Sequence, residues 1–146
     1  MNKDFFKTTK ILDGGMGQEL LARGMKPKGT LWSANALVDK KYHNLILDIH
    51  NDFIKSGADV IVTTTFTTRR KRLRENGLED QFKYLNQKAC EIAQKAKSNH
   101  PNVKIAGGLP PQNLTYEEDK RSEEDIVKDH SELAEILNPS VDFFYF

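Results

Sequence analysis

Three short segments carry the groups in this sequence that could bind a small ligand. They are Asp13-Gly14-Gly15-Met16-Gly17, Thr63-Thr64-Thr65 and Gly107-Gly108, and each directly follows an apolar run. Glycines let a ligand approach the backbone and leave N–H donors free for an anion such as a carboxylate. The Asp13 carboxylate could accept a hydrogen bond from an ammonium group. The threonine hydroxyls could form a hydrogen bond with either an ammonium group or a carboxylate. These are residue types of an amino-acid site, although tight turns and strand preference explain them equally well.

The elements that must position these groups follow from the hydrophobic pattern. Functional groups of parallel α/β folds gather at the carboxyl ends of the strands, where the three segments are expected to lie. Alternating strands and helices predict parallel strands with crossover helices. Strands are predicted at residues 10–12, 59–66, 103–108 and 141–146. Helices are predicted at residues 18–23, 39–57, 67–76, 80–99 and 122–137, with Asp39 and Ser122 as N-caps and a loop at 25–38 anchored by Trp32.

Composition narrows the classes of function. The chain has 146 residues, which predicts one domain. Its 22 Lys and Arg against 21 Asp and Glu give a net charge of +1, which disfavours a globally basic nucleic-acid binder. No apolar run approaches the roughly 20 residues of a membrane helix, and the first residues do not form a signal peptide. We therefore expect a cytoplasmic protein without nucleic-acid or membrane partners.

Other candidate residues have simpler interpretations. The single cysteine, Cys90, excludes an internal disulfide and a multi-cysteine metal site, and its setting in a helix favours a structural thiol. His43 and His50 are seven residues apart, whereas a helical metal pair usually has a spacing of four, so both are expected at the edge of an apolar stripe. The basic run 69–74 predicts a solvated helix face. The carboxylates at 117–119 and 123–125 predict a polar loop and the acidic first turn of a helix.

Four stretches in register resemble the homocysteine S-methyltransferase family. The resemblance implies a TIM-like (β/α)8 barrel, of which residues 1–146 would be a single partial domain with about the first four strands, a half-barrel or truncated barrel. The stretches are Lys10 to Leu20 around the DGG turn, Leu31-Trp32-Ser33-Ala34, His50 to Phe66, and Ile105 to Pro111.

The same resemblance implies a function and a set of site residues. Enzymes of this family transfer a methyl group to the homocysteine thiol and form methionine, a step of methionine biosynthesis. By resemblance, Asp13 would hold the substrate amino group and the backbone of Gly14 and Gly15 would face its carboxylate. Thr64 and Thr65 would line the pocket. No catalytic residue is assigned to this chain.

The sequence departs from the family in its metal site. Family members hold zinc with three cysteines that belong to the second half of the barrel, and Cys90 matches none of them. The chain alone is therefore expected to be inactive. The methyl donor stays open, although Thr67 and Thr68 stand near a position where betaine-dependent enzymes have an aromatic residue, which disfavours betaine.

Two alternatives to the enzyme remain at this point. The chain could be a non-catalytic half-barrel that forms a homodimer through its fourth strand or pairs with a separate chain carrying the missing carboxyl-terminal half. It could also be a small open α/β sheet that binds another amino acid at the DGG turn.

Overall fold

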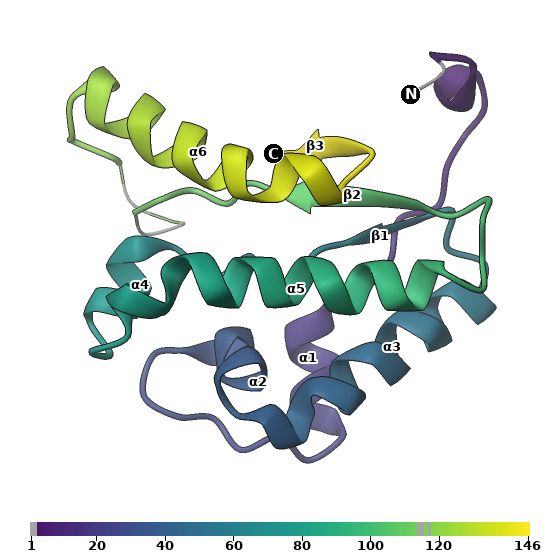
Figure 1. Cartoon of the computed structure of the whole chain (residues 1–146), viewed down its shortest axis with the longest axis horizontal. Helices are drawn as coiled ribbons and strands as arrows, with labels where there is room; N and C mark the ends of the chain where they lie inside the picture. The colour runs from purple at the N-terminus through teal and green to yellow at the C-terminus, as the bar shows by residue number, and fades with distance from the viewer. Residues whose placement is uncertain (1–2, 114–115, 117) are drawn as a thin grey trace.

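A computed structural model describes residues 3–113, 116 and 118–146, and it shows an open parallel sheet covered by helices (Figure 1). The strands are β1 (Val60–Val62), β2 (Lys104–Gly108) and β3 (Phe143–Tyr145), in the order β1-β2-β3. Both pairings are parallel, with Ile61 opposite Ile105 and Gly107 opposite Phe144. The predicted α/β class with parallel strands and crossover helices is confirmed.

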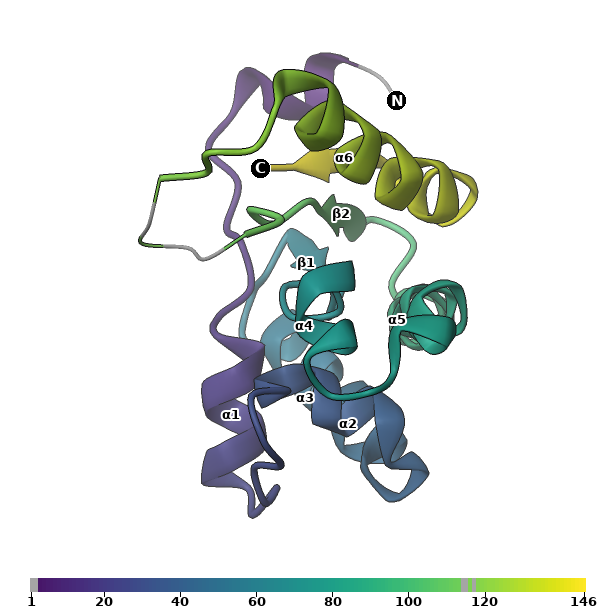
Figure 2. The same cartoon turned by 90° about the vertical axis from the view of Figure 1, so that its left-hand side faces the viewer.

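Helices connect the strands and lie side by side along the sheet. In Figure 1, α3, α5 and α6 follow one another from bottom to top, and α3 packs on α5 as α5 packs on α6. The view in Figure 2 places α1 and α6 at opposite ends of the molecule. The α-helices are α1 (Met16–Ala22), α2 (Asn35–Val38), α3 (His43–Lys55), α4 (Arg70–Arg74), α5 (Phe82–Lys97) and α6 (Glu123–Leu137).

The main core lies between the helices. Ile46 and Ile49 of α3, Leu85 of α5, and Leu133 and Leu137 of α6 are fully buried in one apolar cluster. The helical spacing of these residues places them on one face of each helix, which is why the helices form and dock together. A second cluster, which includes Ile61 of β1 and Ile105 of β2, lies between the sheet and α5. Together the clusters fix the sheet against its helical layer.

The prediction of a strand at residues 10–12 is wrong. Leu12 forms a single isolated bridge with Val60. Further pairing does not develop because the Ile11 N–H donates to the Asp59 carboxylate at 2.9 Å instead of a backbone carbonyl. The described residues thus form three strands and one bridge, where four strands were predicted.

The predicted strand at residues 59–66 is too long. Strand β1 ends at Val62, and the Thr65 N–H turns back to the Thr63 carbonyl at 2.7 Å. Two side-chain bonds then replace the backbone ladder, since the Thr63 hydroxyl accepts from the Gly108 N–H and the Thr65 hydroxyl donates to the Gly108 carbonyl. The threonine segment is therefore a loop at the carboxyl edge of the sheet.

Helix boundaries follow local capping chemistry. Ser122 caps α6 as predicted, because its hydroxyl accepts a hydrogen bond from the Asp125 N–H at 3.1 Å. Asp39 accepts from the Lys41 N–H, but it precedes the 3₁₀ turn Lys40–Tyr42, and α3 begins at His43. The predicted loop at 25–38 contains the 3₁₀ turn Trp32–Ala34 and α2.

Removing the α6 cap should destabilise the protein measurably. We expect Ser122→Ala to lower the free energy of unfolding by about 1 kcal/mol, the usual loss for an N-cap hydroxyl. Urea denaturation followed by circular dichroism measures the change. The matched control is Ser131→Ala, at an exposed position of the same helix, which should leave stability the same or slightly higher. Equal stability of both variants would contradict the role of the cap.

Candidate functional site

A cavity of about 460 Å³ opens at the carboxyl edge of the sheet. Its walls come from the glycine turn and start of α1, the segment after β1, the 3₁₀ turn at Trp32, and the end of β3. These elements converge because the strands are parallel and their ends meet on one edge. The lining residues are Leu12 to Gln18, Trp32, Ser33, Val62, Thr63, Thr64, Phe66 and Tyr145.

The Asp13 carboxylate is the acidic group at this cavity. Its Oδ2 accepts a hydrogen bond from the Val62 N–H at 2.8 Å, while its own N–H donates to the Val60 carbonyl at 2.9 Å. The side chain is 5% exposed. Burial raises the pKa of Asp13 from 3.8 to about 7, against the opposing effect of the Val62 hydrogen bond. A bound cation would therefore find a carboxyl group that ionises near neutral pH.

His50 lies directly beside Asp13. Its Nδ1 is 3.9 Å from Asp13 Oδ2, and its side chain is fully buried, so the predicted position at the edge of the apolar stripe is wrong. Neither ring nitrogen has a hydrogen-bond partner within the described part of the chain. Burial lowers the pKa of His50 to about 4, so the imidazole is neutral at pH 7. His43 is elsewhere, with Nε2 2.9 Å from the Leu37 carbonyl oxygen.

Close packing leaves no room for a side chain at two glycines of the turn, Gly14 and Gly17. A Cβ on Gly14 would lie 2.8 Å from the Phe53 ring, and one on Gly17 would lie 2.3 Å from Trp32 Nε1. Trp32 has a φ of 50°, a left-handed conformation that bulky residues rarely adopt, and it is 40% exposed at the cavity. The glycine turn and the strained tryptophan therefore fix one another and form one wall.

The two predicted threonines differ in their surroundings. Thr64 lines the cavity, and its buried hydroxyl has no hydrogen-bond partner among the described residues. Thr65 is fully buried and its hydroxyl donates to the Gly108 carbonyl at 2.7 Å. Asp13, Gly14, Gly15 and Thr64 thus share one cavity, while Thr65 faces the end of β2.

Two aromatic residues of the cavity wall, Phe66 and Tyr145, were not predicted from the sequence. They line the cavity together with Trp32. Phe66 is the last residue of the predicted strand 59–66, and Tyr145 is next to the last residue of the predicted strand 141–146, so their position near the carboxyl edge was an available signal. Their contribution is apolar surface rather than a reactive group.

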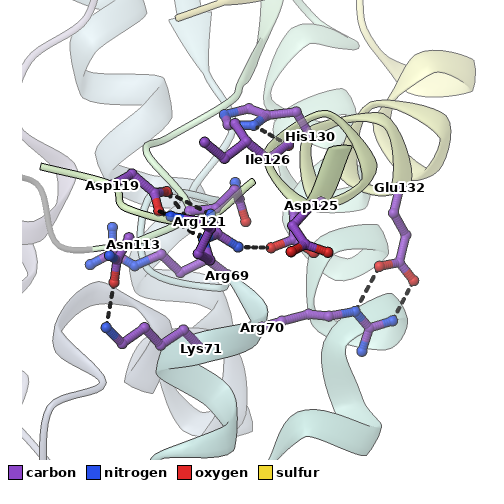
Figure 3. Close-up of polar contacts among 12 residues, drawn as sticks. Arg69, Arg70, Lys71, Asn113, Asp119, Arg121, Asp125, Ile126, His130 and Glu132 are labelled. Carbon is purple, nitrogen blue, oxygen red and sulfur yellow. Dashed lines mark hydrogen bonds and ion pairs between the residues drawn. The ribbon is translucent and has the colours of Figure 1, made fainter. Parts of the chain in front are cut away.

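The basic run is not simply a solvated helix face, and Figure 3 shows its contacts. Arg69 is 2% exposed and donates to the Pro111 carbonyl at 2.7 Å. Arg70 forms a two-point pair with Glu132 of α6, and Lys71 donates to Asn113. The prediction is therefore wrong for these residues, which fasten α4 to the loop after β2 and to α6.

The predicted acidic groups also have structural partners. Residues 123–125 form the acidic first turn of α6, as predicted. Asp119 pairs with Arg121 at 2.7 Å, and this bond lowers the pKa of Asp119 to about 2 (Figure 3). Glu117 lies outside the described residues. None of these contacts involves the cavity at the glycine turn.

Comparison with known proteins decides the family. Residues 10–146 match the family model described as Homocysteine S-methyltransferase. The chain belongs to this family. The homocysteine S-methyltransferase of Escherichia coli (strain K12) is 36% identical over 88 residues, which cover 60% of this chain and 28% of the relative. The S-methylmethionine–homocysteine S-methyltransferase of Rattus norvegicus is 30% identical over 132 residues, which cover 90% of this chain and 33% of the relative.

A solved homocysteine S-methyltransferase shares the fold. The metallated form of MmuM from Escherichia coli superposes with a TM-score of 0.80 at 28% identity, covering 96% of this chain and 54% of that enzyme. The chain therefore spans about a third or less of these two curated relatives and about half of the solved enzyme.

None of the helices in the described ranges is long and apolar enough to cross a membrane.

The residues described here do not fit the zinc site that the homocysteine S-methyltransferase family implies. Cys90 is buried on α5, and burial raises the pKa of its thiol to about 11, which opposes formation of a thiolate ligand. Over the part of the chain that the structure describes, no group of three or more His, Cys, Asp or Glu could hold a metal ion. We therefore derive no metal chemistry from these residues.

The contact between Gly17 and Trp32 can be tested by fluorescence. Gly17→Ala should displace the indole, shift the emission of this single tryptophan, and lower stability by about 1–3 kcal/mol, the usual effect of overpacking. Gly15→Ala is the matched control, because its Cβ would meet nothing closer than 3.7 Å. Identical emission spectra for Gly17→Ala and the unmodified protein would refute the predicted contact.

The buried carboxyl group predicts a specific pH dependence of stability. Between pH 4 and 7 the unfolded chain loses the Asp13 proton while the folded chain keeps it, so stability falls as pH rises. The shift from 3.8 to about 7 corresponds to at most about 4 kcal/mol. Urea denaturation of the unmodified protein and of Asp13→Asn from pH 5 to 8 gives the difference between their free energies of unfolding. This difference isolates the contribution of Asp13, because the contribution of His50 is present in both proteins. A constant stability difference would show that the pKa is not raised.

Proposed function

We propose that this chain supplies the homocysteine-binding part of a homocysteine S-methyltransferase. The observation that carries the proposal is the buried Asp13 carboxylate at a cavity of about 460 Å³ in a chain of this family. The Val62 N–H occupies part of its hydrogen-bonding capacity, and a carboxylate has about four lone-pair sites. Asp13 can therefore also accept hydrogen bonds from the ammonium group of an amino acid.

The charge of that ammonium group stabilises the ionised form of Asp13. An opposite charge within about 4–6 Å lowers a carboxyl pKa, which reverses the effect of burial. Binding of an amino acid and loss of the Asp13 proton are then coupled. The interaction is selective for a cation, because a neutral ligand would not lower the pKa of the carboxyl group.

Other groups of the cavity match the rest of the substrate. The backbone of Gly14 and Gly15, which has no Cβ to block approach, faces the substrate carboxylate. The Thr64 hydroxyl, which has no partner within the described residues, offers a further hydrogen bond. Trp32 and Phe66 provide an apolar wall for the methylene groups. Thr65 acts indirectly, since its bond to Gly108 holds the loop in place.

We further propose that the chain alone binds homocysteine without completing methyl transfer. Zinc converts a bound thiol into a nucleophilic thiolate, and the residues described here do not fit such a site. S-methylmethionine is the donor to test first, since the name of the Rattus norvegicus relative includes it. No methionine should form when this chain is incubated with homocysteine and that donor.

Calorimetric titration with L-homocysteine tests the binding site. We expect Asp13→Asn to weaken binding by about 1–3 kcal/mol, the range for losing a hydrogen bond to a charged group. Asp48→Asn, at an exposed position of α3, is the matched control and should bind like the unmodified protein. Equal affinities for the protein and Asp13→Asn would refute the role of Asp13, and the absence of binding by the unmodified protein would refute the proposed function.

A further inference from the structure

His50, beside the candidate site, has two ring nitrogens without hydrogen-bond partners among the described residues. It is fully buried on α3. Buried polar groups in folded proteins are nearly always hydrogen-bonded, so each exception needs an explanation. The Asp13 carboxylate lies beside the ring, with 3.9 Å between Nδ1 and Oδ2. That gap is about 1 Å longer than a hydrogen bond.

We propose that His50 is a positioning residue for Asp13: when Asp13 is ionised by an ammonium-bearing ligand, the Nδ1–H of His50 donates a hydrogen bond to Oδ2 and fixes the carboxylate. The inference deepens the proposed function and rests on it for the identity of the ligand. His50 does not touch the ligand; it acts through the carboxylate. Oδ2 would then accept from two donors, the Val62 N–H and the imidazole, and Oδ1 would be left to face the cavity.

The chemistry of the pair supports this role. A neutral imidazole has one N–H donor and one acceptor nitrogen, so the tautomer with hydrogen on Nδ1 can serve the carboxylate. The pKa of His50 is lowered to about 4 by burial, which keeps the ring neutral and avoids a second buried charge. A hydrogen bond to the charged form favours ionisation and lowers the pKa of a carboxyl group. The bond from His50 therefore offsets part of the rise in the pKa of Asp13 that burial causes.

No other charged group competes for His50 within the described residues. Asp13 is the acidic group within 4 Å of its ring, and charged side chains are not among the causes of either pKa shift. Elements packed on α3 carry few free charges, because α2 and β1 contain no titratable residue. On the other packed elements, Glu19 of α1 pairs with Arg23, which also pairs with Asp52, while Lys41 pairs with Asp39. On α5, Lys88 pairs with Glu91, Lys97 pairs with Asp142, and the thiol of Cys90 is neutral. The other titratable side chains of these elements are Lys40, Tyr42, Lys83, Tyr84 and Lys95.

Three substitutions separate positioning from packing. His50→Asn places an amide N–H near the position of Nδ1, whereas His50→Gln places it near Nε2, away from Asp13. His50→Leu fills similar space without a donor. A general packing role would affect Asn and Gln alike, so the contrast between them is the decisive comparison even if the leucine variant fails to fold.

The direct measurement is a ¹³C NMR titration of the Asp13 carboxyl group in the full chain without ligand. We expect an apparent pKa near 7 in His50→Leu and His50→Gln, the value that burial gives without a hydrogen bond from His50. In the unmodified protein the pKa should lie about 1–2 units lower, the shift expected for a hydrogen bond to the charged form. In His50→Asn it should stay near the value of the unmodified protein. The same Asp13 pKa in all folded variants would overturn the proposal.

Ligand binding provides the second readout. L-homocysteine affinity, measured by calorimetry from pH 6 to 8.5, should fall at the acidic end as Asp13 becomes protonated. In His50→Gln this fall should move to higher pH by the same 1–2 units, while His50→Asn retains the original profile. An unshifted profile in His50→Gln would count against the proposal. Absence of homocysteine binding in the unmodified protein would instead refute the proposed function, and the NMR titration would still decide the link between His50 and Asp13.

Discussion

One hydrogen bond, from the Val62 N–H to the buried carboxylate of Asp13, determines how the candidate site is assembled. At the other end of the same short segment, the Asp59 carboxylate accepts the Ile11 N–H. Backbone bonds of Ile11 and Asp13 hold this segment at the start of β1, and the two carboxylates accept the N–H groups through which a longer backbone ladder would extend. The consequence is a glycine turn held at the edge of the sheet, next to a carboxyl group whose pKa is raised by the burial that this docking requires.

In the loop after β1, side chains again form the hydrogen bonds that a backbone ladder would otherwise make. Thr63 and Thr65 bond to the backbone of Gly108 through their hydroxyls, so the chain leaves the sheet without leaving these groups of Gly108 unsatisfied. This frees Thr64 to lie at the cavity. Hydrogen bonds from side chains thus take the place of backbone pairing, and they create both the space of the cavity and the polar groups that line it.

Much of this arrangement could be predicted from the sequence. Periodicity placed the long helices, Ser122 was identified as a cap, and the three glycine and threonine segments were expected at the strand ends. The carboxylate bond that shortens the first strand and the hydroxyl bonds that shorten the second could not be read from propensity, because threonine favours strands. His50 and Arg69 were also missed, since a polar residue near an apolar stripe gives no sign of whether it is buried or which distant loop it meets.

The order of the strands has a consequence for how the molecule is made. The spatial order β1-β2-β3 is also the chain order, and each parallel pair is joined by one crossover containing a long helix. Strands β2 and β3 therefore each emerge from the ribosome after the strand with which they pair, because synthesis proceeds from the amino terminus. The sheet can grow by successive addition at one edge, so its assembly needs no rearrangement of strands already paired.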